Sequence, residues 1–486
     1  MSKKSTVEFR ENRLNSIVGY VGQISDLSKQ LNNSCLKNAD RSFNQTYQCQ
    51  QITSILTLLS IKDSAFVFHA PVGCTGCAGS LNIQYKIGQT QRGISKPINA
   101  KWISSNFDDS DVIHGGEAKL REAILTAESR YKPKIIFVLA SCASGIIGDD
   151  IDTVVNQTQS ETEAKLIPIH CEGFSSKVSS TGYDTCYNAI LEYFIEPSAK
   201  KEDDLINVLS TITFSVWDQL ELKRLLDKLS LKPNFIPSFA SAEDLKRITA
   251  AKLNTSICKV HGDYLFEVLE SKYNIPHTNT LMPLGIKNTD NWLLEIGELT
   301  GKTEETKQLI EEEHKRIEES LQALRKELKG IRAFISAGSG RGITAASLAE
   351  DLGFEVVGIH TFHLDNILAD EVEELTNQQY DFIFDVANMQ PFEQANIIEK
   401  LKPDVVISIG TNVIWAGKQG VPSLNIIDDQ KKFLGYNGVL SIGRDLVNTL
   451  KNPGFNIKLS KHRKLPYTDT WLQDTPFKYL KNTEGN

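Results

Sequence analysis

The chain lacks the features that mark several large classes of protein. It has no basic excess, since 53 lysines and arginines face 61 acidic residues for a formal net charge of -8, and a general nucleic-acid binder would normally be basic. No apolar run approaches the ~20 residues that cross a bilayer, because the longest, such as IIFVLA and DVVISIG, have the length of strands. No G-x-x-x-x-G-K-[ST] loop is present, so this chain is not predicted to be an ATPase.

The N-terminus also lacks an apolar signal core, since MSKKSTVEFRENRL is mostly polar. We therefore expect a cytoplasmic protein whose thiols stay reduced. Its cysteines then need an explanation other than disulfide bonds. A free cysteine is most often a small buried apolar residue, and each candidate is weighed against that reading. The cysteines are Cys35, Cys49, Cys74, Cys77, Cys142, Cys171, Cys186 and Cys258.

Short apolar runs alternate with helical patterns along the 486 residues. KIIFVLAS (134–141) and KLIPIHCEGF (165–174) are strand-like, as are RAFISAG, FEVVGIHT, DFIFDVAN, DVVISIG and SLNIID further on. Such alternation predicts parallel sheets covered on both faces, with ligands bound outside the carboxyl ends of the strands. We expect an α/β fold of three Rossmann-like domains. Their predicted bounds are 1–205, 206–329 and 330–454, with the tail 455–486 packed against the first.

Two segments help to define these domains. Residues 304–330 carry an apolar stripe at helical spacing and end at a glycine, which predicts a long amphipathic helix. Residues 245–276 read as strand, loop and helix, with Cys258 near the start of the helix.

A glycine-rich turn, AGSGRGITAASLAEDLG, follows one predicted strand and precedes a helix. Its glycines read G-x-G-x-G, which misses the third-glycine spacing of a dinucleotide loop, and the next strand ends without an acidic residue for a ribose hydroxyl. NAD binding is therefore disfavoured. We expect a tight turn whose N–H groups and Arg341 face another anionic group.

The stretch HAPVGCTGCAGS contains the close cysteine pair Cys74 and Cys77. Zinc sites usually draw ligands in two close pairs, and there is no second pair. A redox C-x-x-C at a helix start after a strand fits the local pattern, although the proline and glycines suit a loop equally well. The third reading is an iron–sulfur cluster whose thiolates come from distant loops, with Cys49 and Cys142 as the other candidates.

The surrounding sequence is more specific. YQCQ, HAPVGC, SCASGIIGDDID and HCEGF, in this order and spacing, resemble the nitrogenase component 1 family from about residue 12 to residue 455. HCEGF at 170–174 is similar to the α-type subunit rather than the β-type. The resemblance implies metal clusters between domains and at a subunit interface, in an α2β2 assembly with a β-type homologue. It also implies electron supply from an ATP-dependent iron–sulfur reductase.

The resemblance carries over to individual residues. Cys49, Cys74 and Cys142 match the α-subunit ligands of the interface cluster, which is P-cluster-like or 4Fe–4S. Cys258, in SICKVHGDYL, matches the single cysteine of the active-site iron–sulfur cofactor. Lys418, in AGKQGVP, matches the lysine near the organic acid of that cofactor.

Two further residues belong to this comparison. Arg341 lies close to an arginine of the cofactor pocket. Cys77 is an extra thiol, either a core residue or a spare ligand. The heterometal of the cofactor stays open.

Three positions depart from the nitrogenase pattern. Leu434, in KKFLGYNG, stands where a histidine ligates the cofactor. Ser179 and Asp184 stand where a pocket glutamine and a proton-donating histidine occur. Dinitrogen reduction is therefore not expected, and we consider His363 or His261 as a substitute ligand. Asp184 is a substitute proton donor in this reading, since a carboxyl buried beside a cluster can have a raised pKa.

Three functions are consistent with this pattern. The first is the catalytic α-like subunit of a nitrogenase-like multi-electron reductase. HCEGF and RENRLNSIVGY resemble the methylthio-alkane reductases, which cleave a C–S bond. The alternative is a scaffold for nitrogenase cofactor maturation. An electron-transfer subunit with only the interface cluster is disfavoured by Cys258 and Lys418.

Overall fold

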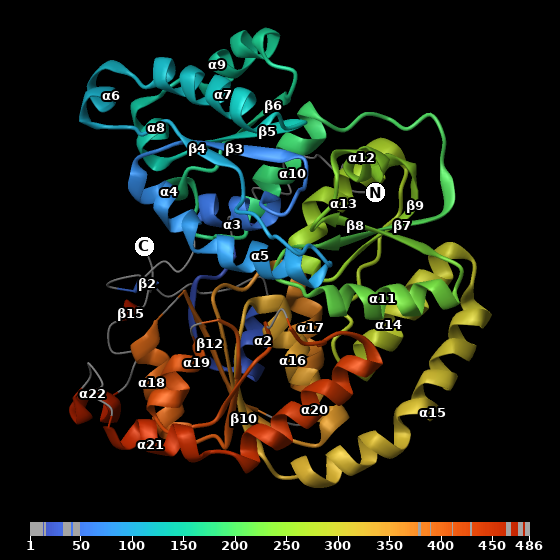
Figure 1. The fold of residues 1–486 in the computed structure, drawn as a ribbon. Coiled ribbons are helices and arrows are strands. Elements are labelled where there is room, and N and C mark those ends of the chain that lie inside the picture. Colours follow the sequence, from blue (N-terminus) through green and yellow to red (C-terminus); the bar gives the residue numbers. More distant parts are fainter. Residues whose placement is uncertain are drawn as a thin grey trace.

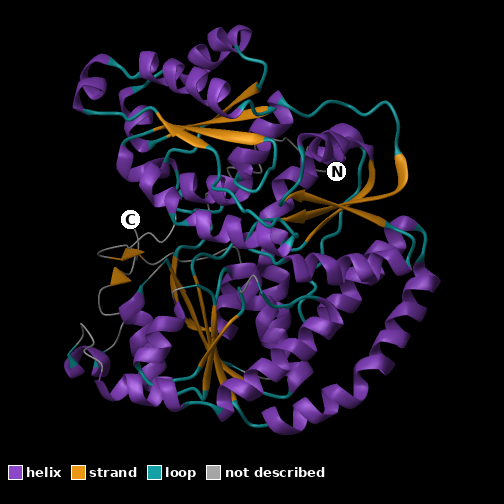
Figure 2. Cartoon of the chain, in the orientation of Figure 1, coloured by secondary structure: helices purple, strands orange, loops and turns teal. Residues whose placement is uncertain are grey.

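A computed structural model describes residues 13, 16–32, 40–41, 49–377, 381–388, 390–410, 412–427, 430–462, 468–474 and 480–481. Cys35 lies outside these residues. Within them, no helix combines the length and the apolar character needed to cross a membrane. The described chain forms three sheets of four, three and six strands, besides a two-stranded ribbon, and Figures 1 and 2 show them as separate layers flanked by helices.

The first unit is built on a parallel sheet whose central strands are completely buried. Every residue of SAFVFH and IIFVLA is buried, because helices cover both faces of the sheet. α7 and α9 contact one face, and α10 contacts the other together with α3 (Figure 1). In spatial order the strands are β4 (Trp102–Ser104), β3 (Ser64–His69), β5 (Ile135–Ala140) and β6 (Lys165–Ile169). The helices are α3 (Gln50–Leu58), α4 (Val72–Gly79), α5 (Leu81–Gln91), α6 (Asp109–His114), α7 (Glu117–Tyr131), α8 (Cys142–Ile147), α9 (Ile151–Thr158) and α10 (Thr181–Tyr193), with 3-10 turns η1 (Gln159–Glu161) and η2 (Gly173–Ser175).

The middle unit has a smaller parallel sheet. The predicted domain boundary at residue 205 falls inside its central strand, because the charged segment before that residue already pairs with its neighbours. In spatial order the strands are β8 (Lys232–Pro237), β7 (Glu202–Ser210) and β9 (Ala251–Ser256). The helices are α11 (Val216–Lys228), α12 (Ala242–Lys246), α13 (Lys259–Tyr273), α14 (Ile286–Thr300) and α15 (Thr303–Leu328), with the 3-10 turn η3 (Arg247–Ala250).

The third unit has the largest sheet, and it includes a strand from the N-terminal region. β1 pairs antiparallel with β12 from Gly19–Ala387 to Gln23–Ile383, whereas the other pairs in this sheet are parallel. In spatial order the strands are β1 (Gly19–Gln23), β12 (Ile383–Ala387), β11 (Glu355–Thr361), β10 (Arg332–Ser336), β13 (Val405–Ser408) and β14 (Ser423–Asn425). The helices are α2 (Ile24–Asn32), α16 (Ser339–Leu352), α17 (Ala369–Asn377), α18 (Pro391–Leu401), α19 (Asn412–Lys418) and α20 (Gly435–Lys451), with the 3-10 turn η4 (Asn366–Leu368).

The pairing of β1 moves the N-terminal segment out of the first unit, to which the sequence assigned it. The described part of the tail also differs from its predicted place, because it packs on the third unit. α21 (Gly454–His462) contacts α19, and α22 (Asp469–Gln473) contacts α18. The amide of Asn396 donates to the carbonyl of Leu472 at 3.1 Å. Near the end of the chain, β15 (Leu480–Lys481) pairs with β2 (Asp40–Arg41).

Most of the predicted elements are confirmed. The predicted helix 304–330 is α15, whose buried leucines and isoleucine form one stripe. The predicted strand, loop and helix of 245–276 are β9 and α13, with Cys258 as the residue that precedes the first turn of α13. The three-unit α/β fold with parallel sheets is therefore confirmed. The units do not have separate interiors, since one apolar core joins the first and middle units and another joins the middle and third units.

Candidate functional site

The three predicted interface-cluster thiols all lie at helix starts in the first unit. Cys49 is the N-cap of α3, Cys74 is in the first turn of α4, and Cys142 is the first residue of α8. α4 and α8 follow the carboxyl ends of the neighbouring strands β3 and β5, where an α/β sheet normally binds its ligands. The α8 turn is fixed by a capping box between Ser141 and Ser144, which holds the Cys142 backbone in place.

A glycine of the HCEGF element shows that two of these thiols converge. A Cβ atom at Gly173 would lie 3.3 Å from Cys142 Sγ and 3.5 Å from Cys49 Sγ, so only glycine leaves the space beside both sulfurs open. Burial, followed by the proximity of Cys142 and Cys49, raises the pKa of Cys74. The fold therefore brings all three thiols together. Gly173 belongs to the HCEGF element, which in the sequence indicates only the subunit type. Its position beside the two sulfur atoms becomes visible only in the structure.

This thiol group lies at a partly open, apolar face. Cys49, Cys74 and Cys142 are half-buried. Val72 on the Cys74 helix is 63% exposed, Ile146 on the Cys142 helix is 72% exposed, and Phe174, next to Gly173, is 58% exposed. Among the described residues no three histidine, cysteine or acidic side chains are arranged to hold a single metal ion. The three thiols lie together at this open face. The seven described cysteines are all free, and Cys77 is exposed.

The second candidate site is a cavity of about 310 Å³ where the three units meet. Residues from α3, α5 and α10 form the wall of the first unit, and the start of α13 forms the wall of the middle unit. The glycine-rich turn, the end of β11 and the ends of β13 and β14 form the third wall. The lining residues used below are Thr53, Ser179, Ser180, Tyr183, Cys258, His261, Ser339, Gly340, Arg341 and His363.

Cys258 lies at the N-terminus of α13, where the helix dipole favours negative charge. Its backbone N–H donates to Ser256 Oγ at 3.0 Å, and that hydroxyl donates to the Cys258 carbonyl at 2.6 Å. Burial raises the pKa of the Cys258 thiol to about 11, although the Arg341 guanidinium opposes the shift. The thiol is therefore protonated without a metal, and metal binding would displace the proton.

The middle glycine of the predicted turn makes room for this thiol. A Cβ atom at Gly340 would lie 3.2 Å from Cys258 Sγ, which is closer than a relaxed packing contact. The turn is a strand-to-helix connection, as expected, since Gly338 precedes the first residue of α16. Gly340, which has no side chain, lets the backbone approach the Cys258 sulfur closely.

We expect Gly340→Ala to weaken whatever bond the Cys258 sulfur makes, because the new methyl group competes for its position. Gly342→Ala is the matched control, since a Cβ atom there meets its neighbours at 3.7 Å or more. The iron retained after anaerobic purification should fall several-fold for Gly340→Ala relative to Gly342→Ala. Equal iron contents would show that the close contact at Gly340 is unimportant.

The cavity lining contains polar atoms that the described chain leaves unsatisfied. Thr53 Oγ1, Ser180 Oγ and Ser339 Oγ are buried without a hydrogen-bond partner. Such groups destabilise a protein unless a bound molecule engages them. Arg341 is also buried; it donates to the Ile426 carbonyl at 3.4 Å, and it forms no ion pair with any described carboxylate.

These observations describe what the cavity can hold. One soft thiol, two imidazoles, several hydroxyls and a buried guanidinium suit a polar, negatively charged group with metal and sulfur atoms. The lining therefore fits an iron–sulfur cofactor, with Cys258 as the thiolate ligand and Arg341 beside the negative charge. Ser179, predicted in place of the pocket glutamine, also lines the cavity.

Leu434 and Lys418 are not among the described residues that line the cavity. Leu434 is the buried N-cap of α20, and its N–H donates to Asp218 Oδ1 at 3.0 Å. It borders a small adjoining space that also touches Arg341. Lys418 Nζ lies 4.7 Å from the ring centroid of Trp415. The predicted contact of Lys418 with a cofactor thus remains a prediction.

Asp184 lies outside the cavity lining, in a buried ionic cluster that sequence reasoning missed. Arg13 Nε donates to Asp184 Oδ2 at 2.7 Å, and the same guanidinium pairs with Asp263 and, at 3.6 Å, with Asp365. The three carboxylates come from α10, α13 and the segment after β11, so Arg13 joins all three units. The described geometry does not favour Asp184 as a direct proton donor to the cavity. No local motif could have revealed partners so distant in sequence.

This cluster predicts an unusual dependence of stability on pH. Burial raises the pKa of Asp184 from 3.8 to about 7, against the opposing effect of Arg13. The folded protein therefore keeps a proton that the unfolded chain releases between about pH 4 and pH 7, so this group makes the protein less stable as the pH rises. Burial likewise raises the pKa of Asp263, whereas His363 and Arg13 hold that of Asp365 below its usual range despite burial.

Asp184→Asn removes one titrating group from the cluster and should flatten this dependence. We expect the difference in thermal midpoint between pH 5 and pH 8 to be smaller in the variant than in the wild-type assembled protein. Asp203→Asn, which removes an exposed carboxylate on β7, is the control for the loss of a charge. An unchanged difference for Asp184→Asn would contradict the assigned proton.

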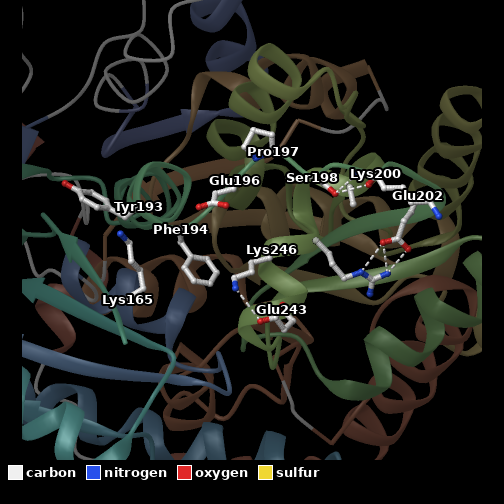
Figure 3. Close-up of a pocket in the computed structure, with 12 residues that line it drawn as sticks. Lys165, Tyr193, Phe194, Glu196, Pro197, Ser198, Lys200, Glu202, Glu243 and Lys246 are labelled. Carbon is white, nitrogen blue, oxygen red and sulfur yellow. Dashed lines mark hydrogen bonds and ion pairs between the residues drawn. The ribbon is translucent and has the colours of Figure 1, made fainter. Parts of the chain in front are cut away.

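A larger cleft of about 850 Å³ opens near β6 and α12, at the junction of the first and middle units. Figure 3 shows Lys246 near Phe194 and Glu243 in this cleft. Its charged groups pair with one another: Arg247 and Glu202 are 2.9 Å apart, and Lys246 and Glu243 are 3.5 Å apart. These exposed pairs describe a solvated groove rather than a built site.

Comparison with known proteins gives the class to which this fold and these sites belong. The model of the family described as nitrogenase component 1 type oxidoreductase matches residues 49–451. The chain belongs to this family.

Two kinds of curated relative are similar to the chain to the same degree. The nitrogenase molybdenum-iron protein alpha chain of Methanothermobacter marburgensis is 27% identical, over 82% of this chain and 86% of that protein. The nitrogenase iron-molybdenum cofactor biosynthesis protein NifE of Rippkaea orientalis is 28% identical, over 91% and 92%. The solved structure of nitrogenase Cp1 at pH 5 superposes with a TM-score of 0.73, at 21% identity over 94% of this chain and all of that one. The likeness to that structure confirms the fold.

Proposed function

We propose that the chain is the catalytic α-type subunit of a nitrogenase-like reductase, which reduces a small substrate by several electrons at an iron–sulfur cofactor. One observation carries the proposal: the Cys258 thiol lies in a buried cavity where three units meet, beside Arg341 and several unsatisfied polar atoms. A chain that kept only an interface cluster would have no need of that cavity. The free thiols agree with a reducing, cytoplasmic setting.

The proposed partner is a β-type homologue, in an α2β2 assembly. The support is the half-buried group of Cys49, Cys74 and Cys142, together with the exposed apolar side chains on the same helices. A partner that covered this face would supply further thiolates and complete a P-cluster-like or 4Fe–4S cluster. Electrons would enter from a separate ATP-dependent iron–sulfur reductase, since this sequence has no phosphate-binding loop of its own.

The cofactor, when bound, supplies the electron storage and the metal sites for reduction. The chain supplies the rest of the site. Cys258 anchors one end, and the N-terminus of α13 stabilises its thiolate. Arg341 offers a fixed positive charge, and its guanidinium lies 4.6 Å above the Phe214 ring, which keeps it in place. Cys258 and Arg341 are both buried, and this strengthens their electrostatic contacts.

The substrate proposal is a small methylthio-alkane, whose C–S bond is cleaved to a thiol and a hydrocarbon. It rests on the HCEGF and RENRLNSIVGY elements of the sequence alone, because the similar proteins are named as nitrogenase chains and as cofactor biosynthesis proteins. Leu434 and Ser179 support a substrate other than dinitrogen, since neither side chain reproduces the histidine or the glutamine of the nitrogenase pattern.

A scaffold for cofactor maturation is the second candidate. Leu434 favours it, since a scaffold that later releases its cofactor has reason to lack a strong second ligand. The NifE relatives support it as well as the alpha chains support the first proposal. The two candidates differ in one property: a scaffold gives its cofactor to an acceptor protein, whereas a catalytic subunit retains it during turnover.

The test is anaerobic co-production with the β-type partner, followed by iron analysis and spectroscopy. We expect more iron per αβ unit than a single interface cluster accounts for, and a second paramagnetic species in addition to that cluster. Mixing with a cofactor-free acceptor should leave the cofactor in place. Iron sufficient for only one cluster would disprove the cofactor proposal, and rapid transfer to the acceptor would support the scaffold.

A further inference from the structure

We propose that His363 is a second protein ligand of the cofactor. It would replace the histidine ligand of the nitrogenase pattern, whose position is occupied here by Leu434. This inference rests on the proposed function in one respect, namely that the cavity holds an iron–sulfur cofactor. A second ligand suits a catalytic subunit, which retains its cofactor, better than a scaffold, which releases it. Imidazole is a good iron ligand, and a second ligand would fix the orientation of a group that one thiolate leaves free to turn.

The first observation is the position of the imidazole. His363 lines the cavity that contains Cys258, and its Nε2 faces the Asp365 carboxylate. The residue is only 9% exposed. With Nε2 facing Asp365, Nδ1 is the ring nitrogen left for a ligand.

The second observation is that the backbone around His363 is held from both sides. Thr361 Oγ1 donates to the His363 carbonyl at 2.8 Å. Leu364 exchanges two backbone hydrogen bonds of 2.9 Å with Ile17 of the N-terminal segment. Ser16 Oγ donates to Asp365 Oδ1 at 2.5 Å. These hydrogen bonds fix the segment around His363, as expected for a residue whose side chain must be held in one position.

The third observation is the carboxylate beside the ring. Asp365 Oδ2 lies 3.1 Å from His363 Nε2, within ion-pair distance. A histidine that binds a metal through one nitrogen typically turns the other towards a carboxylate. Binding through Nδ1 would leave the Nε2 proton facing Asp365. The N-terminal segment would then act as a positioning element, since Arg13 and Ser16 hold Asp365.

His261, the other imidazole of the cavity, is better explained by packing. Its ring centroid lies 4.4 Å from that of Tyr183, with 30° between the planes, and 6.1 Å from that of Phe214. No described carboxylate lies within ion-pair distance of its ring. Burial lowers the pKa of His261 to about 3, which keeps the ring neutral inside this aromatic group.

The experiment compares three variants of the assembled protein: His363→Ala, His261→Gln and His360→Gln. His360 is the control, because it lies near the end of β11, shortly before His363, is fully buried, and pairs with Asp385 at 2.7 Å outside the cavity lining. Iron release to a chelator is timed for each. Pulsed electron paramagnetic resonance on histidine-labelled samples then looks for a nitrogen nucleus coupled to the cofactor.

We expect His363→Ala to release the cofactor iron about tenfold faster than His360→Gln or more, since altered metal-site contacts typically change affinity by 10- to 100-fold. The nitrogen coupling should disappear in His363→Ala alone. Equal release rates for His363→Ala and His360→Gln would overturn the assignment, as would a coupling lost in His261→Gln instead. A wild-type protein with interface-cluster iron only would reject the proposed function itself, which is a different result from a loaded cofactor without a histidine ligand.

Discussion

Replacement of Cys258 by alanine should leave an assembled protein that has lost its cofactor. Cys258 is the only cysteine among the described residues that line the cavity, so no other described thiolate there can take its place. The fold should survive, since the side chain is small and the helix start is held through Ser256. We expect the iron beyond the interface cluster to fall close to zero, and the multi-electron activity to fall at least about 100-fold.

Both the iron content per αβ unit and the rate of turnover are measured for Cys258→Ala and for the control variant Cys186→Ala. Cys186 is a suitable control because it is fully buried in the first unit and its thiol donates to the Ser54 carbonyl at 3.5 Å, away from both sites. Burial raises the pKa of Cys186 to about 12, as expected for a thiol that stays protonated in the core. If Cys258→Ala kept both its iron and its activity, Cys258 would not be the cofactor ligand.

The second large effect is expected at the interface thiols. Cys142→Ala should remove the interface cluster and weaken the α–β association, because Cys142 and Cys49 flank the space that Gly173 leaves open. Cluster binding contributes directly to assembly when its ligands come from two chains. We expect the αβ contact to dissociate in size-exclusion chromatography at concentrations where the wild type remains tetrameric.

Cys77→Ala is the matched control for this experiment. Cys77 is on the same short helix as Cys74, but it is exposed, and it does not border the Gly173 space. Its replacement should leave the interface cluster, the assembly and the activity unchanged. A loss of cluster iron in Cys77→Ala that equalled the loss in Cys142→Ala would show that the ligand set has been assigned wrongly.

The sequence predicted the three-unit architecture because the strand signals are strong. The parallel strands are nearly continuous runs of apolar residues, such as SAFVFH and IIFVLA, and each is followed by a helical pattern. It did not predict that β1 joins the third sheet, since a short strand such as GYVGQ has no period that specifies a partner. Pairing between segments so far apart in the sequence depends on tertiary packing rather than on local propensity.

Some residues of the candidate site could be predicted from the sequence, and others could not. Cys258 was recognisable because its motif and the helix after it are local, and the structure places it in the cavity. The Arg13 cluster was invisible, because two of its carboxylates lie 171 and 250 positions away from the arginine and the third lies further still. Gly173 and Gly340 were read as motif and turn residues. Their additional role, the space they leave beside a sulfur atom, appears only when distant segments are brought together.

One measurement tests the central claim most directly. The iron-loaded α2β2 protein is mixed with its reductase, ATP and dimethyl sulfide, and methane and methanethiol are followed by gas chromatography. Two electrons and two protons convert one thioether to one hydrocarbon and one thiol. The account predicts both products in equal amounts, dependent on ATP, and absent from Cys258→Ala. A fully loaded protein that forms no reduced product from this or any other small substrate, and that gives its cofactor to an acceptor, would contradict it.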